Sequence, residues 1–109
     1  MGNGYEARWK DTQRKRQEAH AGRAEALEGR RREDAMIAAE RHAVIAQGFT
    51  AADVDRWGHE NRVLIERRLA EDRAWGAQLA RWADEDRRRQ EAWAAANPEA
   101  ARLLEAMPS

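Results

Sequence analysis

Large apolar residues recur in the second half of the chain at intervals of eighteen residues. Trp57, Trp75 and Trp93 follow this interval, which equals five turns of an α-helix at ~3.6 residues per turn. A continuous helix through this stretch places the three indoles on one line. Four further large apolar residues fall within about 60° of that line at ~100° per residue: Val54, Leu64, Leu79 and Trp82. The pattern predicts a long helix with one apolar stripe.

The first half of the chain repeats this spacing. Trp9, Leu27 and Ile45 are also eighteen residues apart. Helical periodicity extends over residues 5–47 and again over 51–96, where Gly and Pro are sparse. The sequence therefore predicts two long helices of similar length, each with an apolar stripe.

Residues that end and begin helices separate these segments. Gly48 stands where a glycine in the left-handed conformation closes a helix. Thr50 is the expected N-cap of the second helix, with Asp53 three residues later as in a capping box. Asn97 and Pro98 then predict a short third helix over residues 98–107, because Pro is favoured at the first helical position.

The expected fold is all-α. It is a long antiparallel two-helix hairpin, coiled-coil-like, with a short C-terminal third helix in a single domain over residues 1–109. A turn of residues 48–50 is short enough to make the long helices antiparallel neighbours. Facing residues then have numbers that sum to about 98, which places Trp75 opposite Arg23 and Trp82 opposite Arg16. Guanidinium groups stacked on indoles would contribute roughly 0.5–2 kcal/mol per pair.

Composition agrees with this fold. Hydrophobic residues make up 42% of the 109 residues, but 24 of them are Ala, so large core-forming side chains are few. Charged residues make up 37%. Abundant Ala, Glu and Arg with helical periodicity is typical of coiled coils and long helices.

The charge balance argues against a nucleic-acid partner, and the apolar pattern against a membrane. Twenty basic and twenty acidic residues give a net charge of zero, whereas nucleic-acid binders usually carry a strongly basic face. The N-terminus lacks the apolar region of a secretory signal. No apolar run approaches the ~20 residues of a transmembrane helix. We expect a cytoplasmic or virion-associated protein without signal peptide or transmembrane segment.

Catalytic chemistry finds little support in the residues. The chain has no Cys, and Ser109 is its only Ser. His20, His42 and His59 are scattered and match no metal-ligand or catalytic spacing. The run from Asp84 to Arg89 consists of three acidic residues followed by three arginines. Such a run is typical of a solvated, ion-paired helix face. We predict no catalytic residue, no cofactor and no metal site, and a protein that is not an enzyme.

Apolar stripes on long helices favour an assembly function. A helical pair alone leaves part of each Trp facing water, and weaker apolar strips lie beside the stripes at Met36, Ile65 and Leu69. Exposed strips of this kind usually mark interfaces. We expect a structural protein that binds itself, as a dimer or higher, or a larger protein assembly such as a phage virion or scaffold. The predicted interface residues are Trp9, Leu27, Ile45, Phe49, Val54, Trp57, Leu64, Trp75, Leu79, Trp82, Trp93, Leu103, Leu104 and Met107.

The C-terminal helix is expected to pack against a surface. Leu103, Leu104 and Met107 share one side of a helix too short to persist alone in water. The nearest apolar surface is the aromatic group Tyr5, Trp9 and Trp93 at the open end of the hairpin. A neighbouring subunit is the other candidate surface.

An alternative function comes from the connection between the long helices. In residues 43–57, Gly48 is followed by Phe49, with Val54 six and Trp57 nine residues after the glycine. This arrangement resembles a helix-turn-helix motif, which implies a DNA-binding regulator that uses residues 43–62. The resemblance makes Arg56 and Arg62 the candidate DNA contacts.

Overall fold

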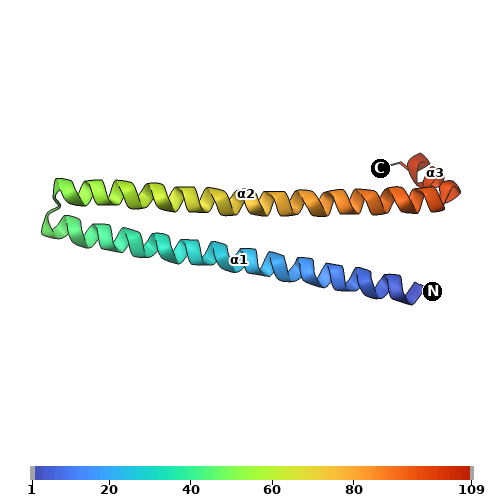
Figure 1. Cartoon of the computed structure of the whole chain (residues 1–109), viewed down its shortest axis with the longest axis horizontal. Coiled ribbons are helices and arrows are strands. Elements are labelled where there is room, and N and C mark those ends of the chain that lie inside the picture. Colours follow the sequence, from blue (N-terminus) through green and yellow to red (C-terminus); the bar gives the residue numbers. More distant parts are fainter. Residues whose placement is uncertain (1, 109) are drawn as a thin grey trace. The chain divides into compact units, whose positions relative to one another are not determined.

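The computed structural model describes residues 2–108, and this part of the chain is built from three helices (Figure 1). Helix α1 spans Gly2–Gln47, α2 spans Ala51–Ala96 and α3 spans Pro98–Ala106. No strand occurs among the described residues. The predicted all-α fold of two long helices and a short third one is confirmed. Helix α1 begins at residue 2 rather than at the expected residue 5, and α3 ends one residue before the expected residue 107.

The chain divides into two units between Ala51 and Ala52, so that α1 belongs to one unit, and α2 (apart from its first residue) belongs with α3 to the other. Residues 48–50 connect them, as predicted. The antiparallel packing of the hairpin and its single domain stay predictions that follow from the short connection.

Neither unit has an interior. In the described part of the chain no side chain is fully buried, and the most covered residues are only partly so. Each long helix has 46 residues, and helices of this kind owe most of their stability to packing of an apolar face. The packing that would bury such a face is absent from each helix taken by itself.

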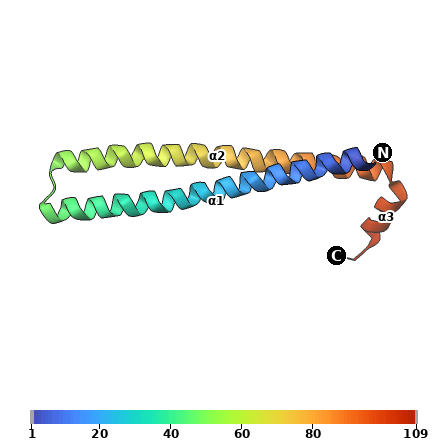
Figure 2. The same ribbon diagram turned by 90° about the horizontal axis from the view of Figure 1, so that it is seen from below.

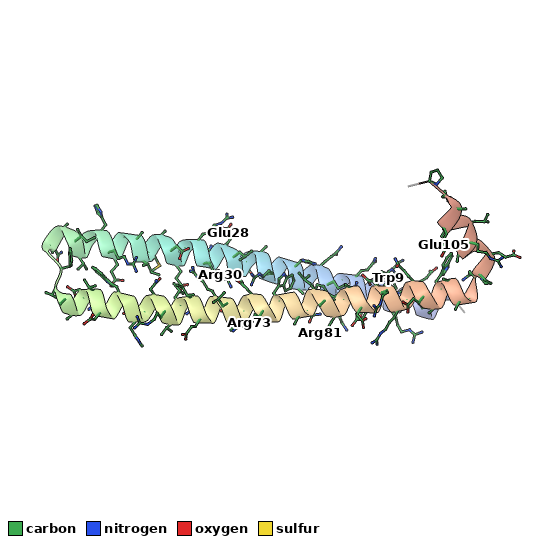
Figure 3. All side chains as sticks on the ribbon, turned by 90° about the horizontal axis from the view of Figure 1, so that it is seen from above. Trp9, Glu28, Arg30, Arg73, Arg81 and Glu105 are labelled. Carbon is green, nitrogen blue, oxygen red and sulfur yellow. The ribbon has the colours of Figure 1, made fainter. Side chains whose placement is uncertain are left out.

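Ion pairs along the helix surfaces supply local stability instead. In α1, Asp11 binds Lys15 at 3.1 Å and Glu28 binds Arg31 at 2.8 Å. These pairs join residues three or four positions apart, which are neighbours on a helix surface, and each contributes about 0.2–0.5 kcal/mol. Glu28 and Arg30 project from opposite sides of α1 (Figure 3), so the ion-paired face of Glu28 is distinct from the side that carries Arg30.

Gly48 closes α1 as the sequence predicts. Its φ of 89° is the positive value that favours glycine. Its backbone nitrogen donates a hydrogen bond to the carbonyl oxygen of Ile45 at 3.1 Å. Thr50 directly precedes α2, and Asp53 lies in the first turn of that helix.

Asn97 joins α2 to α3 differently from the expectation. It occupies the N-cap position with Pro98 at the start of α3, as predicted, but its side chain makes no capping hydrogen bond. Its Nδ2 atom instead donates to the carbonyl oxygen of Trp93 at 2.9 Å, and its backbone nitrogen donates to the same oxygen at 2.9 Å. Carbonyl groups in the last turn of a helix lack partners within it, so Asn97 stabilises the end of α2. Beyond it, α3 leaves the line of α2 (Figure 2).

The apolar side of α3 is exposed. Leu103 is 70% exposed, Leu104 58% and Met107 64%. Trp93, in the same unit, is 44% exposed. Within the unit of α2 and α3 this face therefore stays exposed, and its packing against Tyr5 and Trp9 stays a prediction.

We predict that deleting residues 98–109 has little effect on the stability of the isolated chain. Exposed side chains without packing partners contribute within about 0.5 kcal/mol, and Asn97 remains to end α2. Thermal unfolding followed by circular dichroism at micromolar concentration measures the effect. A fall of several degrees in Tm would show that α3 packs on the chain after all. Unchanged Tm with a smaller assembly in light scattering would show that α3 binds a neighbouring subunit.

Candidate protein-interaction surface

The partly buried residues of α1 recur with the spacing of a coiled coil. Six positions seven residues apart are all partly buried, and three of the positions that lie three residues further on (Thr12, Ala19 and Glu33) are partly buried as well. Alternating steps of three and four keep a residue on the same seam when the repeat is 3.5 residues per turn. We call these positions the first seam of α1; its partly buried members are Trp9, Thr12, Arg16, Ala19, Arg23, Arg30, Glu33, Ile37 and Val44.

Helix α2 has a first seam of the same kind. Trp75 and Trp82 are one heptad apart on it, and both are partly buried. The remaining partly buried members are Trp57, Leu64, Arg68, Gln78 and Arg89. Val54 occupies the first seam position nearest the start of α2 and is 49% exposed. Both long helices therefore present a heptad repeat.

The heptad repeat divides the predicted stripe into two groups. A spacing of eighteen residues is two heptads plus four residues. Residues at this spacing therefore shift gradually around the helix relative to a seam that repeats every 3.5 residues. Trp57 and Trp75 lie on the first seam, whereas Trp93 lies one position past it. In α1, Trp9 lies on the first seam, while Leu27 and Ile45 lie one position past it.

Apart from Val54, which is exposed on the first seam, the exposure of the stripe residues follows this division. Five of the predicted interface residues are partly buried: Trp9, Trp57, Leu64, Trp75 and Trp82. The other nine are between 39% and 70% exposed: Leu27, Ile45, Phe49, Val54, Leu79, Trp93, Leu103, Leu104 and Met107. Their place in an interface stays a prediction.

A second seam follows the first along α2, displaced by one residue, or about 100° around the helix. It carries four exposed apolar residues: Ile65 (47%), Leu69 (50%), Leu79 (39%) and Trp93 (44%). Gly76 and Ala83 lie between them on the same seam and are also exposed. Ile65 and Leu69 were expected as a weaker apolar strip beside the stripe. Steps of three and four back from Leu79 place both of them on one seam with it.

Aromatic contacts lie along the first seams. The rings of Trp75 and Trp82 meet edge to face, with centroids 5.7 Å apart and an interplanar angle of 88°, an arrangement that aromatic pairs favour. In α1, the guanidinium carbon of Arg16 lies 5.5 Å from the centroid of the Trp9 ring, within the range of a cation–π contact. The sequence placed Arg16 opposite Trp82; the contact observed is with an aromatic of its own helix. The predicted pairs between the long helices stay predictions.

Arginine occupies seam positions where coiled coils usually carry aliphatic residues. The Nε atoms of Arg16, Arg30 and Arg68 and the indole Nε1 of Trp57 are shielded from solvent. Arginine can cover apolar surface with its methylene stem while its charged head stays in water. The first seam of α1 is thus only weakly apolar between Thr12 and Glu33, where Arg alternates with small residues.

The acidic run in α2 is ion-paired, as predicted. Asp84 binds both Arg87 and Arg88, the latter at 3.0 Å, and Asp86 binds Arg89 at 3.4 Å. Within the described residues, no group of His, Asp and Glu is arranged to hold a metal ion. Among residues 2–108, no helix combines the length and apolar character needed to cross a membrane.

One carboxyl group in α1 has an altered acidity. A hydrogen bond from Lys15, and then one from Arg14, hold the pKa of Asp11 below its ordinary value. Both partners favour the charged carboxylate. Because the pKa is lower in the folded than in the unfolded chain, this ion pair stabilises the helix above the ordinary pKa. The contribution is lost as the pH falls through the lowered value.

We therefore expect Lys15→Gln to raise the pKa of Asp11 toward the ordinary value, and Arg14→Gln to raise it less. NMR titration of the Asp11 carboxyl carbon measures both shifts. The helicity of Asp11→Asn should differ from that of the parent chain at neutral pH, and the difference should vanish in strong acid. A larger shift in the Arg14 variant would contradict the assignment of Lys15 as the main partner.

The helix-turn-helix alternative meets an unfavourable electrostatic surface. Arg56, one of the two candidate DNA contacts, lies 3.4 Å from the carboxylate of Asp53. Asp55 and Glu60 add further negative charge nearby. Phosphate contacts supply most of the affinity of non-specific DNA binding, so this surface is poorly suited to a duplex.

We predict no measurable binding to random duplex DNA at physiological salt. Fluorescence anisotropy with a labelled duplex over a range of salt concentrations is the test. A submicromolar, salt-dependent Kd that Arg56→Glu or Arg62→Glu abolishes, with helicity retained, would establish the DNA-binding alternative instead.

Comparisons of the chain with protein-family models, with curated proteins and with solved structures found no match.

Proposed function

We propose that this protein is a structural or assembly protein that acts through helix–helix contacts with other protein chains. The observation that carries the proposal is the exposure of its large apolar residues. Fourteen of them are at least 39% exposed, and none in the described part is buried in a core. Clustered apolar surface of this kind is typical of interaction sites.

The arrangement of this surface supports the proposal. Exposed apolar residues on α2 follow a heptad repeat, which is the pattern by which helices recognise other helices. The first seam of α1, with Arg and small residues in its central part, offers little apolar area of its own. A chain of this design gains stability when other helices cover its seams.

A particle or scaffold is the setting that we propose for this function. Long helices with balanced charge and apolar seams suit an assembly, such as a phage particle, in which neighbouring chains cover those seams. The absence of a recognisable catalytic spacing in the sequence supports a role without catalysis.

Light scattering coupled to size-exclusion chromatography tests the proposal. We expect a dimer or larger species at micromolar concentration. We also expect Tm to rise with protein concentration, since association stabilises the folded chain by mass action. A monomer that unfolds cooperatively, with a Tm independent of concentration, would overturn the proposal.

A further inference from the structure

We propose that the second seam of α2 is a self-complementary surface that binds the same seam of a second copy of this chain. The two α2 helices run antiparallel about a two-fold axis near residue 74. This inference rests on the proposed assembly function and names the partner and the surface. The proposed surface is formed by residues of α2 alone.

The angular relation between the two seams of α2 indicates two neighbours. One residue corresponds to a rotation of about 100°, so the seams point nearly at right angles to each other. A helix in a four-helix bundle contacts its two adjacent helices in about these directions. A second copy bound at the second seam leaves the first seam open to another helix.

Three of the four large apolar residues of the second seam face apolar residues when α2 is placed antiparallel to itself; the fourth, Trp93, lies outside the charged ends and faces Asp55. Leu69 and Leu79 lie at equal distances on either side of residue 74, so each faces the other residue in the second copy. Ile65 and Ala83 are likewise symmetric about that residue. Because the two-fold axis repeats every contact, the surface contains two leucine pairs and two pairs of a large with a small side chain. Large against small is how facing layers interdigitate.

Charges match in the same register. Arg62 and Asp86 are symmetric about residue 74, so Arg62 of each copy faces Asp86 of the other at both ends of the apolar stretch. Asp86 already lies 3.4 Å from Arg89 of its own helix. A carboxylate accepts hydrogen bonds at about four lone-pair sites, and a second arginine can therefore bind it without displacing the first.

The centre of the surface has room for its one acidic residue. Asp72 faces Gly76 of the second copy in this register. A Cβ atom added to Gly76 would meet no atom within 4 Å, so the space beside its backbone is open. Gly76 therefore accommodates the side chain of Asp72 from the second copy.

Other registers lose these matches. Sliding one copy by a heptad places Leu69 opposite Asp72 or Asp86, which buries a carboxylate against an aliphatic side chain. A parallel arrangement in register places Arg62 on Arg62 and Asp72 on Asp72, and like charges at facing positions are unfavourable. The antiparallel register about residue 67 also pairs Arg62 with Asp72 and Leu69 with Ile65, but it places Leu79 opposite Asp55. Among the registers that keep the heptad, the antiparallel one about residue 74 alone pairs Leu with Leu and Arg with Asp.

Cysteine crosslinking in the full chain tests this register, because the chain has no Cys of its own. A mixture of Leu69→Cys and Leu79→Cys chains should form a disulfide-linked dimer between the two variants on mild oxidation. Each variant alone should crosslink poorly, because identical residues then lie ten positions, or about 15 Å, apart along the axis. Disulfides need Cα atoms within about 7 Å. Efficient crosslinking of Leu69→Cys with itself would indicate a parallel pair and overturn the proposal.

Charge exchange supplies an independent test by sedimentation equilibrium. Arg62→Asp and Asp86→Arg should each weaken self-association by about tenfold or more, and the double variant should recover most of the loss. Leu69→Glu should abolish the dimer. The matched control is Val63→Glu, the same introduced charge at a 50% exposed aliphatic residue of α2 outside both seams, which should leave the dimer intact. Equal effects of the two changes to glutamate, or no recovery in the double variant, would overturn the proposal.

The outcomes separate this inference from the proposed function. A dimer in light scattering whose Leu69→Cys and Leu79→Cys chains fail to crosslink in the mixture overturns the α2 surface and leaves the assembly function standing. A stable, cooperatively folded monomer overturns both.

Discussion

Trp75→Ala is expected to lower the free energy of unfolding by about 3 kcal/mol. A Trp side chain buries 150–250 Å² in a core. Burying about half of that area contributes roughly 2–3 kcal/mol at ~25 cal/mol per Å². The edge-to-face contact with Trp82 contributes about 0.5–1.5 kcal/mol more. Urea unfolding followed by circular dichroism, at one fixed protein concentration, measures the change.

Trp93→Ala is the matched control because it makes the same change on the same helix. Trp93 is 44% exposed and lies on the second seam, so its loss should cost about 2 kcal/mol by the same area arithmetic, less than the loss of Trp75 with its ring contact. Equal losses for the two variants would show that both rings are covered alike. A loss below about 1 kcal/mol for Trp75 would show that the first seam faces solvent or an absent partner.

Gly48→Val should destabilise the chain by about 2 kcal/mol. The φ of Gly48 is 89°, and L-residues pay about 1–2 kcal/mol for left-handed backbone. A β-branched side chain is a genuine outlier at positive φ, so the cost lies at the upper end of that range. Thermal unfolding of the full chain measures it.

Gly22→Ala provides the opposite expectation for a glycine in a helix. A Cβ atom added to Gly22 meets nothing within 4 Å, and replacing Gly by Ala in a helix interior contributes about 0.5–1 kcal/mol. This variant should therefore be more stable than the parent chain. If Gly48→Val left the stability unchanged while Gly22→Ala raised it, the connection would not need the left-handed conformation.

The helix ends were readable from the sequence because single residues determine them. Gly48 has the conformation that its position demanded, and Pro98 begins α3 as its fixed φ requires. The role of Asn97 was less accessible. Its side chain can accept from the following helix or donate to the preceding one, and the choice depends on the local backbone geometry that the turn adopts.

The seams were harder to predict than the helices. A spacing of eighteen residues fits a straight helix, and a heptad spacing fits a supercoiled one; over 46 residues the two diverge by more than one position. Trp93 and Leu27 therefore follow the predicted line and yet lie beside the first seam. The placement of Arg16 over Trp9 was also missed, because the sequence offers several indoles to that guanidinium.

The lack of an interior has a consequence for the lifetime of the chain. Eighteen arginines are distributed along it, and each is a cleavage site for a trypsin-like protease once the local helix opens. Helices without a buried core open locally at low free-energy cost, and cleavage then tracks the population of open segments. Under the proposed assembly function, a chain whose seams are uncovered should be degraded quickly, whereas one whose seams are covered by other helices should persist. The amount of protein that survives would then be set by the number of sites to which it can bind.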